Sequence, residues 1–113
     1  KNDLFLLISN SGKTREILEL IELSKELDST IKFIVITGNK NSQLAKLANV
    51  VLLTGSPEEV CALGLAPTTS TTVMNVIGDI LVVETMKKIG FTVEEYNKRH
   101  HGGYLGQRSK KLL

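Results

Sequence analysis

Three short apolar runs, each followed by a turn or by polar residues, constrain the fold of this chain more than any other feature. They are Leu4–Ile8, Phe33–Thr37 and Val50–Leu53. Continuous apolar runs of this length are typical of strands that are buried on both faces of a parallel sheet. The segments between them have room for helices, and a parallel connection needs about a dozen residues or more. We therefore predict an α/β fold with a parallel sheet and right-handed crossovers.

Two of the connecting segments have helical periodicity. Between Thr14 and Leu27 the apolar residues recur at helical spacing, which predicts an amphipathic helix packed on the sheet. Ser42–Ala48 predicts a shorter helix, because Leu44 and Leu47 lie on one helical face.

The last part of the chain is also predicted to be helical. Ser70–Ile89 is apolar around much of its circumference, so we expect a largely buried helix that packs against the rest of the chain or a second subunit. Gly78 inside it needs a close-packing reason, because glycine lowers helix propensity by about 1 kcal/mol. Gly90 is a natural C-terminal stop. Phe91–Asn97 predicts a short helix that begins at Thr92, with a glutamate at capping-box spacing.

Composition narrows the class of protein. The 113 residues suffice for one domain, and 42% hydrophobic with 23% charged residues is typical of a soluble globular chain. The apolar runs are far shorter than the roughly 20 residues of a membrane span, and no signal segment opens the sequence, so we expect a cytoplasmic protein without a membrane partner. The single cysteine excludes an intrachain disulfide and a cysteine-based metal site. A net charge of +2 with 4% aromatic residues argues against nucleic-acid binding.

A polar hexapeptide follows the first apolar run. It consists of Ser9, Asn10, Ser11, Gly12, Lys13 and Thr14. Where a parallel strand ends and a helix begins, backbone N–H groups, small hydroxyls and the positive helix end converge, which favours anion binding. The spacing is neither that of a Walker loop nor that of a dinucleotide fingerprint. The alternative is that the serines and the asparagine only cap the helix.

A second segment joins two carboxylates to a hydroxyl-rich helix start. Glu58 and Glu59 precede the apolar loop 60–66, and five hydroxyl residues follow in Thr68–Thr72. Apolar neighbours raise the pKa of a carboxyl by desolvation, and a general base needs a pKa near the operating pH. The alternative is that both glutamates are surface residues and that Thr68, Thr69 or Ser70 caps the helix.

A glycine-rich tail follows the last predicted helix. His100–Gly106 contains three glycines, which predict positive φ angles or close backbone approach. Its two adjacent histidines are a poor metal site because neighbouring side chains point apart, so we predict no metal. One of the histidines can instead act as an acid or base, or the pair has no chemical role.

Taken together, five motifs resemble those of the SIS (sugar isomerase) domain of arabinose-5-phosphate isomerases. They are Ile8–Thr14, Ile36–Asn39, Leu63–Thr72, Gly78–Asp79 and His100–Gly106. The resemblance implies a flavodoxin-like, five-stranded parallel sheet in a three-layer α/β/α sandwich. It also implies a sugar phosphate bound at the carboxyl ends of the strands and interconversion of D-ribulose 5-phosphate with D-arabinose 5-phosphate, without a cofactor. That product feeds the synthesis of 3-deoxy-D-manno-octulosonate, a lipopolysaccharide and capsule sugar.

The same resemblance assigns site residues. The substrate-binding residues are Ser9, Asn10, Ser11, Thr14, Thr69 and Ser70. Glu59 is expected to be the proton-transfer base, His100 an acid or ring-opening group, and Glu16 an orienting or proton-transfer partner. Sites of SIS proteins form near subunit contacts, so we expect a homodimer or homotetramer.

The chain departs from the family pattern in three respects. Lys13 stands where the family usually has glutamate, and His101 where it usually has proline. Residues 1–113 resemble only the C-terminal part of a single SIS domain, from its third strand, without the paired CBS domains that often follow. We therefore expect a fold that is incomplete at its N-terminus, with Leu4–Ile8 as an exposed sheet edge. Lys13 and this gap favour the alternative of a non-catalytic, phosphosugar-binding regulatory module.

Overall fold

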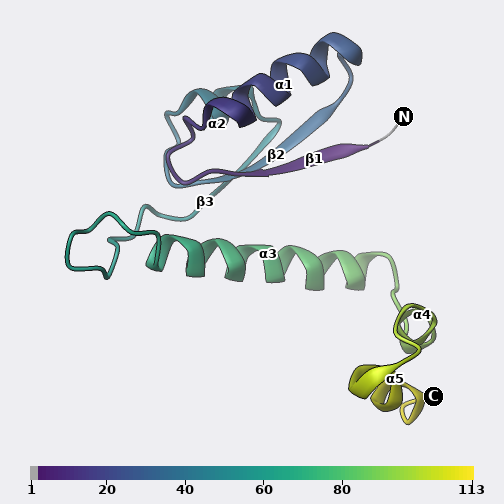
Figure 1. Ribbon diagram of the computed structural model, residues 1–113. Helices are drawn as coiled ribbons and strands as arrows, with labels where there is room; N and C mark the ends of the chain where they lie inside the picture. Colours follow the sequence, from purple (N-terminus) through teal and green to yellow (C-terminus); the bar gives the residue numbers. More distant parts are fainter. Residues whose placement is uncertain (1–2) are drawn as a thin grey trace. The chain divides into compact units, whose positions relative to one another are not determined.

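The computed structural model describes residues 3–113, and strands and helices alternate from β1 to α3 as the sequence predicts (Figure 1). In chain order they are β1 (Leu4–Ile8), α1 (Arg15–Leu27), β2 (Lys32–Thr37), α2 (Gln43–Leu47), β3 (Val50–Leu53), α3 (Thr69–Lys88), α4 (Val93–Arg99) and α5 (Gly103–Lys110). The chain divides into two compact units, Lys1–Gly78 and Asp79–Leu113, with the division inside α3.

The sheet lies in the first unit. Its order is β1-β2-β3, and both strand pairs are parallel, with Leu7 opposite Val35 and Val35 opposite Val51. The predicted α/β class and the position of β1 at a sheet edge are confirmed. Three strands of the five implied by the family resemblance lie among residues 3–113.

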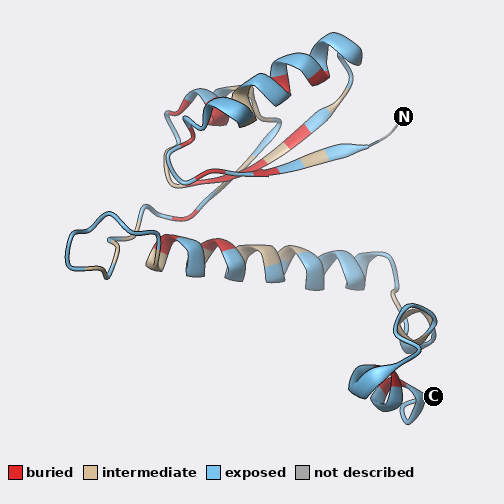
Figure 2. Cartoon of the chain, viewed as in Figure 1, coloured by how far each residue is buried: buried red, intermediate tan, exposed pale blue. Residues whose placement is uncertain are grey.

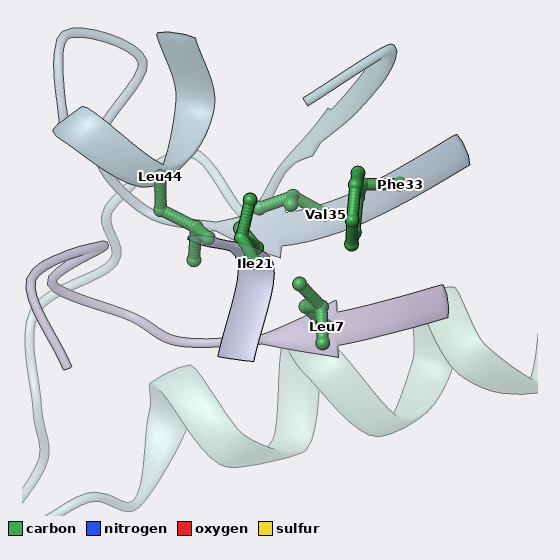
Figure 3. Packing of buried hydrophobic residues seen from close by; sticks show 5 residues of the cluster. All are labelled: Leu7, Ile21, Phe33, Val35 and Leu44. Carbon is green, nitrogen blue, oxygen red and sulfur yellow. The ribbon is translucent and has the colours of Figure 1, made fainter. Parts of the chain in front are cut away.

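The hydrophobic core lies on one face of this sheet. Its buried members point toward one another between the sheet and the helices α1 and α2 (Figure 3). They are Leu7, Ile21, Phe33, Val35 and Leu44. Side chains alternate between the two faces of a strand, so every second residue of β1 and β2 joins this cluster. The predicted packing of the first helix on the sheet is confirmed.

The other face of β1 is open within this chain. Leu4, Leu6 and Ile8 are 56%, 45% and 47% exposed. The expectation of a strand buried on both faces is therefore wrong for β1. It is also wrong for β3, where Val50 and Leu53 are 48% and 47% exposed, because the described residues pack closely on one face of the sheet only.

Helix α3 also departs from expectation. Within residues 3–113 it buries only Ser70 and Met74, and most of its surface is exposed (Figure 2). The prediction of a largely buried helix is wrong for the single chain. A Cβ built on Gly78 would have no neighbour within 4 Å, so the close packing expected at this glycine is absent as well.

The second unit contains the end of α3 followed by α4 and α5. At the end of α3 the Phe91 amide donates to the Met86 carbonyl at 2.9 Å, and Gly90 has a φ of 62°. This geometry ends the helix as predicted. The Thr92 hydroxyl accepts the Glu95 amide at 3.2 Å, which confirms the predicted cap of α4.

The glycine-rich tail contains the helix α5, which the sequence analysis does not predict. Gly103 has a φ of 64°, and a Cβ on Gly106 would clash with the His100 carbonyl. The expected positive φ and close backbone approach are both confirmed. Glycines weaken a helix, so local propensity gives no indication of α5.

Candidate functional site

The turn between β1 and α1 folds around its own hydroxyl groups. Ser9 Oγ lies 2.7 Å from Thr14 Oγ1 and accepts the Gly12 amide at 3.1 Å. Ser11 Oγ accepts the Lys13 amide at 3.2 Å. Ser9 is 6% exposed, whereas the side chains of the other polar residues of the turn face solvent. Ser9 therefore organises the turn from inside, and the exposed groups are free to meet a ligand.

These hydroxyls do not cap α1. Thr14 occupies the N-cap position, yet its side chain makes no capping hydrogen bond and turns to Ser9 instead. The alternative in which the turn serves only as a helix cap is therefore wrong. The positive end of the 13-residue helix α1 faces this turn, and the exposed Lys13 adds a positive charge, so the turn suits an anion.

Glu16 lies beside this turn. It is exposed in the first turn of α1, where a negative charge is favourable to the helix. Its position puts a carboxylate next to the predicted phosphate-binding residues.

Glu59 holds the start of α3. Its Oε2 accepts the Thr68 amide at 2.6 Å, the Thr68 hydroxyl at 2.8 Å and the Ser70 amide at 3.4 Å. The cap of α3 therefore comes from a carboxylate that lies before the loop, and not only from the local hydroxyls that the sequence suggested. Glu58 beside it is exposed. Local spacing could not reveal this contact, because it depends on the path of the loop.

The same contacts reverse the expected pKa shift of Glu59. Hydrogen bonds from the side chains of Ser70 and Thr68, together with the Thr68 amide, lower the pKa of Glu59 to about 2. The predicted rise by desolvation is wrong, because donors that stabilise the charged form outweigh the apolar neighbours. Glu59 is therefore a carboxylate throughout the neutral pH range.

Thr69 and Ser70 lie at the beginning of α3. Ser70 is 1% exposed, and the Thr69 hydroxyl is buried without a hydrogen-bond partner among residues 3–113. The structure thus brings Ser70 to Glu59. It joins no side chain of the Ser9–Thr14 turn to Glu59 by a hydrogen bond within the described residues.

Cys61 orders the loop between Glu59 and Thr68. Its Sγ accepts the amides of Ala66 at 3.1 Å and Leu65 at 3.2 Å. These amides lower the pKa of the Cys61 thiol. No sequence motif indicates a role for Cys61, and these two contacts show that it shapes the loop.

His100 belongs to the second unit, whereas Glu16 and Glu59 belong to the first. Its ring stacks on Tyr96 with centroids 4.1 Å apart, and its Nδ1 lies 3.3 Å from the Tyr96 carbonyl oxygen. Both His100 and His101 are exposed.

Residues 3–113 contain neither a metal-binding cluster nor a membrane-spanning helix. No group of three or more histidine, cysteine or acidic side chains is arranged to hold a metal ion. No helix in the same range is long and apolar enough to cross a membrane.

A parallel α/β sheet with an anion-suited turn at its carboxyl edge defines a broad class of phosphate-binding folds. Within this class, the SIS domain family matches residues 1–84, and the chain belongs to that family. The family membership inferred from the five motifs is confirmed.

Arabinose 5-phosphate isomerases are among the curated relatives that this chain matches. That of Pseudomonas aeruginosa is 47% identical over 108 residues, which cover 96% of this chain and 32% of the relative. That of Escherichia coli K12 is 44% identical over 106 residues, which cover 94% and 32%. The chain therefore spans about a third of the length of these curated relatives.

Two solved structures have the same fold. The first is a Bacteroides fragilis protein to which phosphosugar isomerase activity and a part in capsule formation are attributed. It is 68% identical to this chain with a TM-score of 0.89, and the match covers 92% of this chain and 54% of the Bacteroides fragilis chain. The other, from Escherichia coli CFT073, was solved in complex with arabinose 5-phosphate; it is 33% identical, with a TM-score of 0.81 over 88% and 52%.

Proposed function

We propose that this SIS domain binds a pentose 5-phosphate and interconverts D-ribulose 5-phosphate with D-arabinose 5-phosphate. The observation that carries the proposal is the 44–47% identity to arabinose 5-phosphate isomerases over nearly the whole chain, which includes the Ser9–Thr14 turn and the Glu59 loop. The complex of the Escherichia coli CFT073 protein with arabinose 5-phosphate supports the same ligand class.

The phosphate is assigned to the turn before α1. Ser11, Thr14 and Asn10 expose polar side chains there, and Ser9 Oγ is within 2.7 Å of Thr14 Oγ1. The positive end of α1 and the charge of Lys13 add attraction for a dianion. Binding a phosphate remote from the reacting carbons supplies positioning energy for the chemical step.

Proton transfer is assigned to the acidic and histidine residues. Isomerisation removes the C2 proton of the aldose, forms an enediolate and returns a proton to C1. We assign the base to Glu59, the ring-opening or acid role to His100, and an orienting role to Glu16. A pKa of about 2 keeps Glu59 ionised at neutral pH but makes it a weaker base than an unperturbed glutamate. We also assign Thr69 and Ser70 to substrate binding, because they lie at the start of α3, where Glu59 accepts the Ser70 amide.

The proposal includes the assembly of this chain into a homo-oligomer. The exposed apolar side chains of α3, among them Val76, Ile80 and Val83, support a homodimer or homotetramer. No redox cofactor is needed for an aldose–ketose isomerisation.

One observation favours a second function. Lys13 is exposed in the Ser9–Thr14 turn, at the position where the family resemblance implies glutamate. A positive charge here strengthens anion binding without adding a proton acceptor. This favours a regulatory module that binds a sugar phosphate and does not turn it over.

Exchange of the C2 proton of arabinose 5-phosphate in D₂O, followed by NMR, separates the two functions. We expect exchange and ribulose 5-phosphate formation with the natural full-length protein. Binding without exchange, in that protein and in residues 1–113, would establish the regulatory module instead.

The role of Glu59 is tested in the same assay. Glu59→Gln should lower turnover roughly 10²–10⁴-fold while substrate binding is largely kept. Glu58→Gln is the matched control, because Glu58 is the exposed neighbouring glutamate. Near-normal turnover of the Glu59 variant, or an equal loss in the control, would refute the assignment.

A further inference from the structure

A buried hydroxyl outside the predicted site contacts the Ser9–Thr14 turn, which we call the phosphate turn. Thr37, the last residue of β2, is fully buried, and its Oγ1 donates to the Asn10 carbonyl oxygen at 3.2 Å. The Gly38 amide donates to the same oxygen at 3.0 Å. Thr37 Oγ1 also accepts the Asn39 amide at 3.3 Å. The hydroxyl therefore links the turn after β1 to the turn after β2.

The phosphate turn also packs against the start of α2, where Ser42 is the N-cap residue. Gly12 packs so closely on Ser42 that a Cβ there would clash with the serine side chain, and it would lie 3.1 Å from Thr37 Oγ1. The Gly12 carbonyl also accepts the Leu44 amide at 3.3 Å. The turn is thus fixed between the end of β2 and the start of α2, with the Thr37 hydroxyl at the centre of these contacts.

We propose that Thr37 is a positioning residue for phosphate binding: its hydroxyl sets the conformation in which the Ser9–Thr14 turn presents its polar groups. The proposal rests on the proposed function. Thr37 has no exposed surface, so it acts on a ligand only through Asn10 and the turn. Burying a hydroxyl costs free energy unless it is hydrogen-bonded, and the Thr37 hydroxyl makes two hydrogen bonds.

The effect of removing this hydroxyl is specific. Thr37→Val keeps the size and branching of the side chain but leaves the Asn10 carbonyl with one donor, Gly38. We expect the KM for arabinose 5-phosphate, and its Kd by calorimetry, to rise about three- to tenfold, as for the loss of one buried hydrogen bond. We expect kcat to stay within about twofold, because the contacts of Glu59 with Thr68 and Ser70 are untouched.

Thr54 offers a matched control. It directly follows β3 and is 9% exposed, and its Oγ1 has no hydrogen-bond partner among residues 3–113. Thr54→Val is therefore the same substitution at a neighbouring strand end, without a bond to the turn. It should leave KM and kcat unchanged.

A second pair of variants covers the case in which Thr37→Val does not fold. Thr37→Ser and Thr37→Ala have the same size apart from the hydroxyl, so only the serine variant should keep the wild-type KM. Wild-type binding with equal KM values in Thr37→Ser and Thr37→Ala would overturn the positioning role alone. No binding of arabinose 5-phosphate by the wild-type full-length protein would overturn the proposed function, and this role with it.

Discussion

Two loops carry most of the predicted site residues of the first unit, and they are held in different ways. The Ser9–Thr14 turn is fixed by uncharged groups of its neighbours, above all the buried Thr37 hydroxyl and the backbone of α2. The Glu59–Ser70 loop depends on a charged group as well, because the Glu59 carboxylate accepts bonds from Thr68 and Ser70. Uncharged acceptors, Thr68 Oγ1 and Cys61 Sγ, bind further amides of the same loop. The comparison shows that one loop of this chain is held by uncharged groups, whereas the other also depends on a carboxylate.

The two loops also differ in how deeply the residues around them are buried. The turn rests on residues that are almost fully buried, such as Thr37 and Ser42. The loop exposes Val60, Leu63 and Leu65, each about 80% exposed. Little apolar burial supports the loop, so its conformation depends more on the bonds of Glu59.

Glycine substitutions should give the largest contrast between the two loops. Gly12 and Gly64 both have a φ of 64°, but a Cβ clashes with Ser42 only at Gly12. We expect Gly12→Ala to cost about 2–5 kcal/mol of unfolding free energy, from backbone strain and overpacking. Gly64→Ala should cost about 1–2 kcal/mol, from strain alone. Denaturant unfolding measures both values, and equal losses would contradict the close packing of the turn.

Removal of the carboxylate should loosen only the loop. In Glu59→Ala the Thr68 and Ser70 amides lose their acceptor, so we expect the hydrogen exchange of the Thr68 amide to become about tenfold faster or more. Glu58→Ala is the control. Faster exchange in the Ser9–Thr14 turn as well would show that the two loops are not held independently.

Lowering the pH should affect the two loops of the wild-type protein differently. The pKa of Glu59 is lowered from 4.5 to about 2, so its stabilisation is fully present above pH 4.5 and is lost as the pH falls toward 2. The hydrogen bonds of the Ser9–Thr14 turn involve no titrating group. Amide chemical shifts recorded against pH should therefore change at Thr68 first, and a simultaneous change at Gly12 would be evidence against the distinction.

The smallest effect is expected at the cap of α2. Ser42 Oγ accepts the Ala45 amide at 3.2 Å, so Ser42→Ala should cost about 1 kcal/mol by thermal unfolding. Thr92→Ala removes the equivalent bond of α4 and serves as the comparison. A loss as large as that of Gly12→Ala would mean that Ser42 supports the turn through its hydroxyl and not through packing.

The elements that local patterns determine were predictable from the sequence. The bounds of β1 and β3 match the apolar runs, and the caps at Thr92 and Gly90 follow from residues within one helical turn. The anion site in the turn before α1 rests on local patterns too, and it stays a prediction. Helix α5 was missed because its glycines oppose helix formation locally.

Contacts between distant residues were not predictable. The pKa of Glu59 depends on donors nine and eleven positions away, and apolar neighbours in the sequence suggested the opposite shift. The contact of Thr37 with the turn forms only because β2 lies beside β1. Thr37 and Asn10 are 27 residues apart in the sequence. The exposure of β1 and α3 depends on which other segments cover them, and the periodicity of a segment does not indicate its neighbours.

The most direct test of the account is a titration of the isotope-labelled full-length protein with arabinose 5-phosphate, followed by amide chemical shifts. The account predicts saturable shifts centred on Ser11, Gly12 and Thr14, with none at these residues when arabinose without phosphate is added. Shifts that leave this turn unchanged, or that arabinose reproduces, would contradict the assignment of the phosphate to the Ser9–Thr14 turn.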